Sequence, residues 1–557
     1  MFSRREKAWV HNLVLWASIS VAIVISPGYS FDPINIPKFF ILVPIALMSM
    51  GFCFSNFKTM ASNQYRIVTA LCLLFLVQML FVMLFSKGYI NQQIFGTFGR
   101  NTGFISYVGL ISILLSAAYV ADRQLNRKLA LGLIWVGALS MAYGLLQTTG
   151  NDPIKWNSFN NSIVAFSGNP DFASSLLGMS CIAALIYFLN FSLSIPKRLI
   201  AAPYILLGIY LIVRSHAIQG LIVFGIGALI VFYIFLLKQV KTKLSLRVLF
   251  GVLTIPVISF FILGTLKIGP LSHYLYKISV RQRGFYWHAA FNAMKSNPFF
   301  GVGLDSFGDN YYRYRSTKAA LQSLNVQTNA AHNVFLDFGA SGGYPLLLIY
   351  LLLVLFAGWR SMNTIRKLES FDPYFTTIFA VWVGFQAQSL ISINQIGLAI
   401  WGWAFTGVLI GYSYLPDEKL VIPSTSKYKG LLKGNFQKID FTFPVVGLIC
   451  GIILVSPKLL ADHKYKLITN SGSAEQAIAA AYSFPEDSLV TVQIADIFEQ
   501  SKQRAQAITL LKHAVVKNPD YYPAWSTLYS LSPANSQDSS DSLKNMQRLN
   551  PRVQVVK

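Results

Sequence analysis

The chain has 557 residues, of which 54% are hydrophobic and only 12% are charged, and its mean hydropathy is +0.50. A soluble protein of this size carries about 25% charged residues, so the composition excludes an ordinary soluble enzyme. Apolar runs of about 18 residues or more recur along the chain, and each can cross a hydrocarbon core of about 30 Å as a helix. We therefore expect an all-α fold, a polytopic transmembrane helical bundle.

About 12 to 13 spans are predicted in this way. They define a membrane domain at 1–458, which is followed by an extracytoplasmic tail at 459–557. The first run follows a basic N-terminal segment without a clear cleavage site, so we expect it to be retained as a helix. The predicted spans are 9–26, 37–54, 67–86, 104–121, 129–147, 172–193, 199–213, 217–237, 248–266, 344–358, 373–390, 397–412 and 441–457.

Lysine and arginine are distributed unevenly between alternate connections. With the N-terminus in the cytoplasm, the inner segments hold 22 of the 46 basic residues and the five short outer loops hold only 5. The positive-inside rule therefore places the N-terminus inside and the tail outside. Much of the net charge of +24 then reflects topology and not nucleic-acid binding. The outer face still has an excess of basic residues, which favours either an anionic substrate or lipid headgroups.

The four cysteines lie within or beside the apolar runs, and none has the spacing of a zinc site. We therefore expect neither a disulfide framework nor a bound metal. These residues are Cys53, Cys72, Cys181 and Cys450.

The outer loop at 267–343 is too long to be a simple connection. It opens with apolar and aromatic residues at helical spacing, which predict an amphipathic helix over Arg281–Met294 on the outer leaflet. A segment rich in tyrosine and arginine follows at 309–315, and the loop closes on His332 and Asn333. Reactive groups of a membrane enzyme that handles water-soluble substrates belong at such an interface.

After the last span, the composition changes to that of a soluble helical module. A segment ending at Pro485 recurs as a segment ending at Pro519, and the offset of 34 residues is the tetratricopeptide period. The tail therefore resembles about two tetratricopeptide-like repeats over 470–551. Two repeats bury little core alone, so we expect the tail either to bind a protein partner or to cap the outer loop.

Several separated motifs in this order resemble the O-antigen ligase and polymerase superfamily, which consists of membrane glycosyltransferases of the GT-C type. The resemblance covers roughly residues 90–415, and all its motifs fall on the predicted outer face. The motifs are Arg283-x-x-x-Trp287, Asn-Pro-Phe-Phe-Gly-Val-Gly-Leu-Asp-Ser-Phe at 297–307, His332-Asn333-x-Phe-Leu-Asp at 332–337, Phe-Gly-Arg-Asn-Thr-Gly at 98–103, Ser-Gly-Asn-Pro-Asp-Phe at 167–172, and Ser-Ile-Asn-Gln at 392–395.

The resemblance implies a glycan donor linked through pyrophosphate to a polyprenyl lipid, at the outer face of a bacterial cytoplasmic membrane. It also implies transfer with inversion to a glycan, lipid or protein acceptor, without nucleotide, metal or other cofactor. Guanidinium groups stabilise a pyrophosphate leaving group by charge-assisted hydrogen bonds, so Arg283 and Arg100 are the first candidates for that role. An imidazole titrates near neutral pH, so His332 is the candidate general base, and Asn333 is expected to orient it.

Further substrate contacts are expected from Arg281, Arg313, Tyr311 and Tyr312, because tyrosine rings stack on sugar faces. The chain departs from the family at one place. Where the family often has Ser-Arg-Gly, this chain reads Arg214-Ser-His-Ala-Ile-Gln-Gly. Arg214 precedes the serine, which leaves its role in substrate binding open.

Three activities remain open within this class, namely a ligase, a polymerase and a protein oligosaccharyltransferase. The alternative from another class is a transporter or flippase of lipid-linked or anionic envelope precursors, with glutamines along a pathway. Against it, no charged residue lies well inside a span and no repeat relates two halves of the membrane domain. A receptor or scaffold role would leave the motifs around His332 and Arg283 without a function.

Overall fold

The computed structural model describes residues 2–154, 156, 163–190, 193–240, 244–270, 272–275, 278–323, 326–416 and 439–552. Over these residues, the regular secondary structure is entirely helical. This agrees with the expected all-α class, and it follows from the lipid environment, where a helix satisfies all its backbone hydrogen bonds within one segment.

Each of the predicted spans coincides with one long helix. Within the described part of the chain, eight helical segments are long and apolar enough to cross a membrane, and α6 and α19 are shorter apolar helices. The protein is therefore a polytopic helical membrane protein. The long helices are α1 (Arg4–Ile23), α2 (Asn35–Ser55), α4 (Arg66–Phe85), α6 (Phe104–Val120), α7 (Arg123–Thr148), α8 (Pro170–Leu189), α10 (Ala201–Arg214), α11 (Gln219–Phe235), α12 (Leu244–Thr265), α17 (Val334–Lys367), α18 (Pro373–Ser389), α19 (Ile396–Tyr412) and α21 (Thr442–Ser471).

Helices α6 and α19 form the centre of the bundle, since nearly every side chain on both is buried. Gly407 and Gly411 of α19 face the backbone of α6 so closely that a Cβ atom would clash with Leu114 and Ala118. Small residues permit this approach, which is how helices in lipid gain van der Waals contact. Short helices fill several connections: α3 (Phe57–Met60), η1 (Asn63–Tyr65), α5 (Ile90–Phe95), α9 (Ile195–Leu199), α13 (Ser272–Leu275) and the π-helix η2 (Leu236–Val240).

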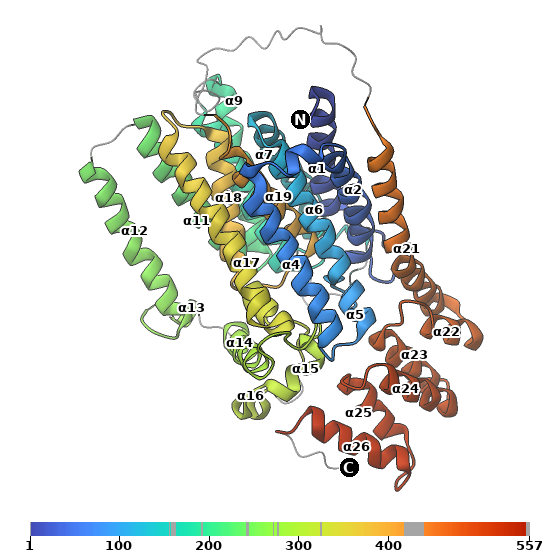
Figure 1. Cartoon of the computed structure of the whole chain (residues 1–557). Coiled ribbons are helices and arrows are strands. Elements are labelled where there is room, and N and C mark those ends of the chain that lie inside the picture. Colours follow the sequence, from blue (N-terminus) through green and yellow to red (C-terminus); the bar gives the residue numbers. More distant parts are fainter. Residues whose placement is uncertain are drawn as a thin grey trace.

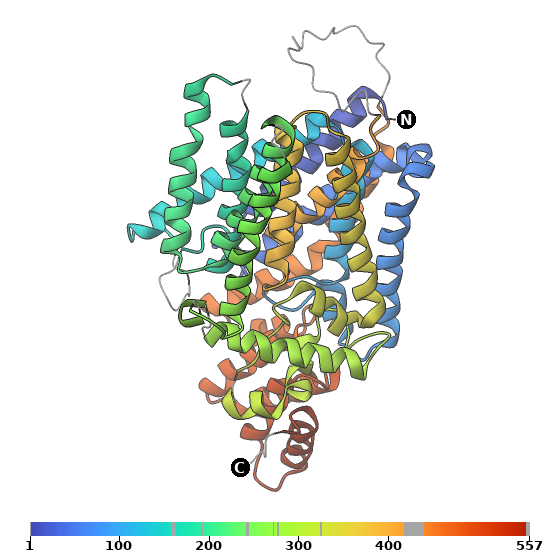
Figure 2. The same cartoon turned by 90° about the vertical axis from the view of Figure 1, so that its left-hand side faces the viewer.

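The 267–343 loop contains three further helices, α14 (Ile278–Ser296), α15 (Phe307–Tyr314) and α16 (Thr317–Gln322). They lie at the end of the bundle away from the N-terminus, as Figures 1 and 2 show. The loop ends earlier than the predicted start of the next span at 344, because Asn333 caps α17 and the helix begins at Val334.

Helix α17 is kinked at Gly343, whose φ of 74° is in the left-handed region. The turn after α14 packs into this kink. The amides of Val302 and Tyr344 donate to Ala340 and Pro298 at 2.8 Å. A Cβ atom on Gly301 or Gly343 would clash with the facing backbone. The glycines of both motifs are therefore required for this close packing.

The tail continues directly from α21, which extends past residue 458 to Ser471. Five helices follow and have their own core of buried apolar side chains. The predicted 34-residue offset relates α22 to α24 and α23 to α25, and Ala480 and Ala514 are buried at equivalent places. The tail lies at the same end as the loop helices (Figure 1). Its helices are α22 (Ala474–Ala481), α23 (Ser488–Gln500), α24 (Arg504–Lys517), α25 (Tyr522–Leu531) and α26 (Gln537–Leu549).

Candidate functional site

His332 lies just before α17, where its backbone is held from both sides. Its φ is 52°, in the left-handed region that non-glycine residues seldom occupy. Trp287 Nε1 on α14 donates to the carbonyl oxygen of His332 at 3.3 Å. The ring of Tyr286 lies 5.4 Å from the imidazole between centroids. The fold therefore brings His332 against the face of α14 that carries Trp287.

Arg283 lies one helical turn before Trp287 on α14. Its Nη2 atom is 3.2 Å from Oδ2 of Asp171, in the first turn of α8. The arginine side chain is 16% exposed, and its buried Nε atom has no hydrogen-bond partner among the described residues. One salt bridge thus fixes the guanidinium and leaves part of its donor capacity unused.

The imidazole of His332 is in an environment that favours its neutral form. Burial, together with the positive charges of Arg283 and Arg100, lowers its pKa to about 4. The group is therefore unprotonated at neutral pH and can accept a proton. A bound anion near Arg283 would offset that arginine's charge and raise the basicity of the imidazole.

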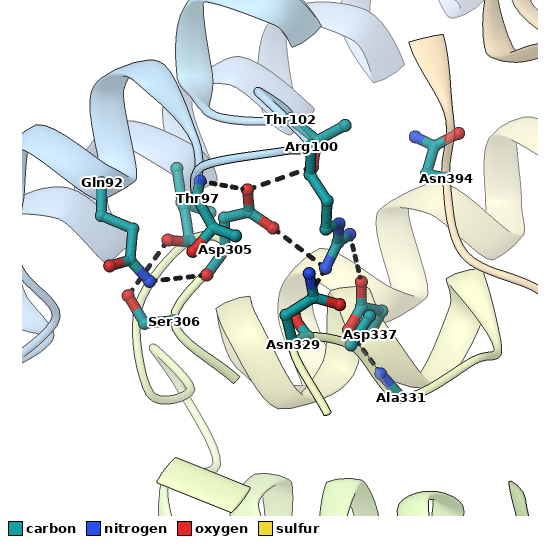
Figure 3. Close-up of polar contacts among 12 residues, drawn as sticks. Gln92, Thr97, Arg100, Thr102, Asp305, Ser306, Asn329, Ala331, Asp337 and Asn394 are labelled. Atoms are coloured by element: carbon teal, nitrogen blue, oxygen red, sulfur yellow. Dashed lines mark hydrogen bonds and ion pairs between the residues drawn. The ribbon is translucent and has the colours of Figure 1, made fainter. Parts of the chain in front are cut away.

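Arg100, from the connection between α5 and α6, is 5% exposed and lies between two carboxylates (Figure 3). Nη1 is 3.2 Å from Oδ1 of Asp305 and donates to the carbonyl of Asn329 at 2.8 Å, and Nη2 is 3.0 Å from Oδ2 of Asp337. Burial alone would lower the pKa of Arg100, but the charges of the two aspartates raise it. Its charge is thus already balanced within the protein.

Asn333 acts as the N-cap of α17. Its Oδ1 accepts the amide hydrogen of Leu336 at 3.1 Å. Among the described contacts, none joins its side chain to the imidazole of His332. The expectation that Asn333 orients the histidine directly is therefore replaced by an indirect one, in which the cap fixes the start of α17.

Arg281 and Arg214 are both exposed, and no described contact joins either side chain to His332. Arg214 ends α10. Nearby Gln219, at the start of α11, is 2% exposed, and its Nε2 atom lacks a partner among the described residues. Ser175 donates to its Oε1 at 3.5 Å.

The Tyr/Arg-rich segment on α15 is largely engaged by protein. Tyr311 is fully buried and packs on Tyr286, with ring centroids 5.5 Å apart. Tyr312 packs on Tyr522 of the tail, with ring centroids 5.0 Å apart, and Nη2 of Arg313 lies 3.1 Å from Oδ1 of Asp520, also in the tail. These contacts leave Tyr311 no surface for a sugar.

Sequence reasoning missed the acidic partners of the site arginines. Three of these partners lie within the motifs that the sequence analysis named, and that membership could have identified them. They are Asp171, Asp305 and Asp337. Asp520 lies in the tail and had no such signal. Among the residues that the structure describes, no group of three or more His, Cys, Asp or Glu side chains is arranged to hold a metal.

The fold and this arrangement define a class, namely a polytopic helical membrane protein with a histidine and an arginine close together at one end of its bundle. Residues 203–351 match the O-antigen ligase family model, Wzy_C. The matched segment runs from α10 into α17 and contains Arg283 and His332, whereas Arg100 and Asp171 lie outside it. The match supports a membrane glycan ligase or polymerase in the broad sense. The curated proteins contain no match to the chain.

Proposed function

We propose that the protein transfers or polymerises a glycan from a polyprenyl-pyrophosphate donor. The observation that carries this proposal is the junction of α14 with the start of α17, where Trp287 bonds the backbone of His332 one turn after Arg283. A proton acceptor and a cation thereby lie beside each other within the segment that matches the ligase family.

In the proposed reaction, His332 takes the proton of an acceptor hydroxyl. The acceptor oxygen attacks the anomeric carbon of the donor sugar from the face opposite the phosphate, so the configuration is inverted. The bond from that carbon to the phosphate oxygen breaks, and polyprenyl pyrophosphate leaves with the electron pair. Arg283 stabilises the negative charge that develops on this leaving group.

The remaining site residues divide by exposure. Arg281 and Arg214 are exposed cations, which we propose assist recognition of the phosphates. Tyr312 and Arg313 contact the tail, so we assign them to docking of the tail rather than to the glycan. Asn333 contributes by capping α17. The reaction draws on no metal or other cofactor, and the acceptor is a glycan, a lipid or a protein.

We place the site at the outer face of a bacterial cytoplasmic membrane, with the N-terminus in the cytoplasm. Two features support this orientation. Basic residues concentrate in the connections at the end where α1 begins, and the loop helices and the tail lie together at the other end (Figure 1). We also propose that the tail, with its two helix pairs, is a repeat module that docks on the outer loop, which the contact of Arg313 with Asp520 supports.

The test uses the purified full chain in lipid vesicles with a labelled polyprenyl-pyrophosphate glycan and no nucleotide or divalent metal. Wild type should release polyprenyl pyrophosphate, while His332→Ala and Arg283→Ala should lose about 100-fold or more in rate. Arg66→Ala, an exposed arginine at the opposite end, is the charge-loss control. Equal activity of all variants, or translocation of the donor without transfer, would reject the proposal, and translocation would favour a flippase.

A further inference from the structure

We propose that Arg100 is a positioning residue that holds the backbone of His332 in its active conformation, and that it does not bind the pyrophosphate itself. This inference rests on the proposed function, because it assigns a role in the same site. It is carried by the contacts of the guanidinium with three separate parts of the outer loop (Figure 3).

The first step concerns the segment just before His332. Arg100 Nη1 donates to the carbonyl oxygen of Asn329 at 2.8 Å. Nη2 donates to Oδ2 of Asp337 at 3.0 Å, and the other oxygen of that carboxylate accepts the amide hydrogen of Ala331 at 3.0 Å. One guanidinium thus holds the chain directly at residue 329 and, through Asp337, at residue 331.

The second step concerns the conformation that this grip maintains. His332 has a φ of 52°, and a non-glycine residue keeps such a conformation only where its surroundings over-determine it. The amide of Ala331 is held by Asp337 and the carbonyl of His332 by Trp287. If the contact between Asp337 and the amide of Ala331 is lost, the backbone of His332 is held on one side only. The imidazole would then sample positions away from Arg283.

The third step concerns how Arg100 itself is held. Asp305, its second carboxylate partner, accepts hydrogen bonds from the amide of Thr97 at 2.7 Å and from Oγ1 of Thr102 at 3.1 Å. Both donors flank Arg100 in the connection before α6. The aspartate therefore ties the guanidinium to its own loop, and the assembly links that loop to the start of α17.

The charge balance argues against direct phosphate binding. Arg100 is 5% exposed and has two carboxylates within 3.2 Å, so most of its charge is compensated before a substrate arrives. Arg283 has a single carboxylate partner and is more exposed. The buried Nε atom of each arginine has no partner among the described residues, so the two differ in charge compensation and exposure, and Arg283 is the better ligand for an anion.

The experiment compares Arg100→Met and Arg283→Met with wild type and with Arg66→Met as the matched control. It measures kcat, the KM for donor and the Kd for polyprenyl pyrophosphate, each across pH. Arg100→Met should lower kcat about tenfold or more at every pH and change the Kd less than about threefold. Arg283→Met should raise the Kd for polyprenyl pyrophosphate about tenfold or more.

If Arg100 acted on His332 only through its charge, Arg100→Met would shift the acid limb of the pH profile but reach the wild-type kcat on the plateau. That result would overturn the proposal. Probe binding weakened as strongly as in Arg283→Met would also overturn it. Should Arg100→Met fail to fold, Asp337→Asn tests the same contacts, since it removes the charge that holds Arg100, and it should show the same plateau loss.

Failure of this inference is distinguishable from failure of the proposed function. If His332→Ala and Arg283→Ala lose transfer while Arg100→Met equals wild type, the positioning role is rejected and the glycosyltransferase stands. If wild type shows no transfer, or His332→Ala keeps it, the proposed function is rejected and the positioning role with it.

Discussion

Arg283 and Asp171 are 112 positions apart in the chain, and Nη2 of the arginine lies 3.2 Å from Oδ2 of the aspartate. This salt bridge joins α14 of the outer loop to the first turn of α8. The carboxylate of Asp171 competes with an incoming phosphate for the guanidinium. The salt bridge therefore limits how readily Arg283 binds a phosphate.

Asp171→Asn should lower transfer by about threefold to tenfold, much less than Arg283→Ala. The amide keeps an oxygen that accepts from the guanidinium, although the hydrogen bond loses its charge. The measurement is kcat/KM for donor in vesicles, with Asp152→Asn as an acidic control on the same side of the membrane. A loss as large as that of Arg283→Ala would instead assign Asp171 a direct part in the chemistry.

The pH dependence of His332 follows from its lowered pKa. Burial and the two arginines bring it to about 4, so the imidazole stays neutral as pH falls through 6.5 and is protonated only near 4. Modification by diethyl pyrocarbonate requires the neutral ring. Peptide-resolved mass spectrometry should therefore show His332 reacting down to about pH 5.

In Arg283→Gln, the midpoint of this reaction should move to higher pH, because one of the charges that disfavours the imidazolium is removed. A midpoint that stays in place or moves down would contradict the arrangement of the two side chains. A midpoint near 6.5 in wild type would contradict the burial of the ring.

Because of Asp309 on α15, we expect the free energy of unfolding to fall as pH rises. Burial is the main reason that its pKa is raised from 3.8 to about 7; the charges of Asp520 and Asp487 act in the same direction, and hydrogen bonds from Asn518 and Gln92 act against it. Between pH 3.8 and 7 the folded protein keeps a proton that the unfolded chain loses. Stability therefore decreases through this window, by at most about 4 kcal/mol.

Asp309→Asn should reduce the fall in unfolding temperature between pH 5 and pH 8, because an amide cannot ionise. Thermal unfolding in detergent measures this, with Asp538→Asn as the control, because Asp538 is only half-buried and pairs with Lys512 at the surface. An identical pH dependence in wild type and Asp309→Asn would refute the assignment.

The tail is fastened to α15 by Asp520, which contacts Arg313 at 3.1 Å and Arg548 at 2.6 Å. Asp520→Ala should release both arginines and increase hydrogen exchange in α15 and α26 while leaving α6 and α19 unchanged. Asp538→Ala is the matched control, because it removes a surface pair with half-exposed Lys512 that contributes roughly 0 to 1 kcal/mol. Unchanged exchange in α15 would show that the tail is held by its apolar contacts alone.

The proposed orientation predicts which positions an impermeant maleimide reaches in intact cells. With Cys450, the exposed native cysteine, replaced by serine, Lys544→Cys in the tail should be labelled and Asn63→Cys should not. After permeabilisation both should react. The reverse pattern would place the site on the cytoplasmic face.

What the sequence by itself determined is the set of spans and the class of protein. A run of apolar residues in lipid has to form a helix, because no water is present to satisfy its backbone, so each predicted span appears as a helix. The ligase resemblance was confirmed over 203–351. The start of α17 was predicted too late, at 344, because the helix begins at the Asn333 cap and only kinks at Gly343.

Only the tertiary structure decided which side chains meet. Arg100 and Arg283 look alike as loop arginines, yet one lies between Asp305 and Asp337 and the other has Asp171 alone. Tyr312 and Arg313 suited a sugar by composition but contact the tail more than 200 positions away. The physical reason is that hydrophobic periodicity is a local property of the chain, whereas ion pairs and aromatic contacts depend on how helices distant in sequence pack.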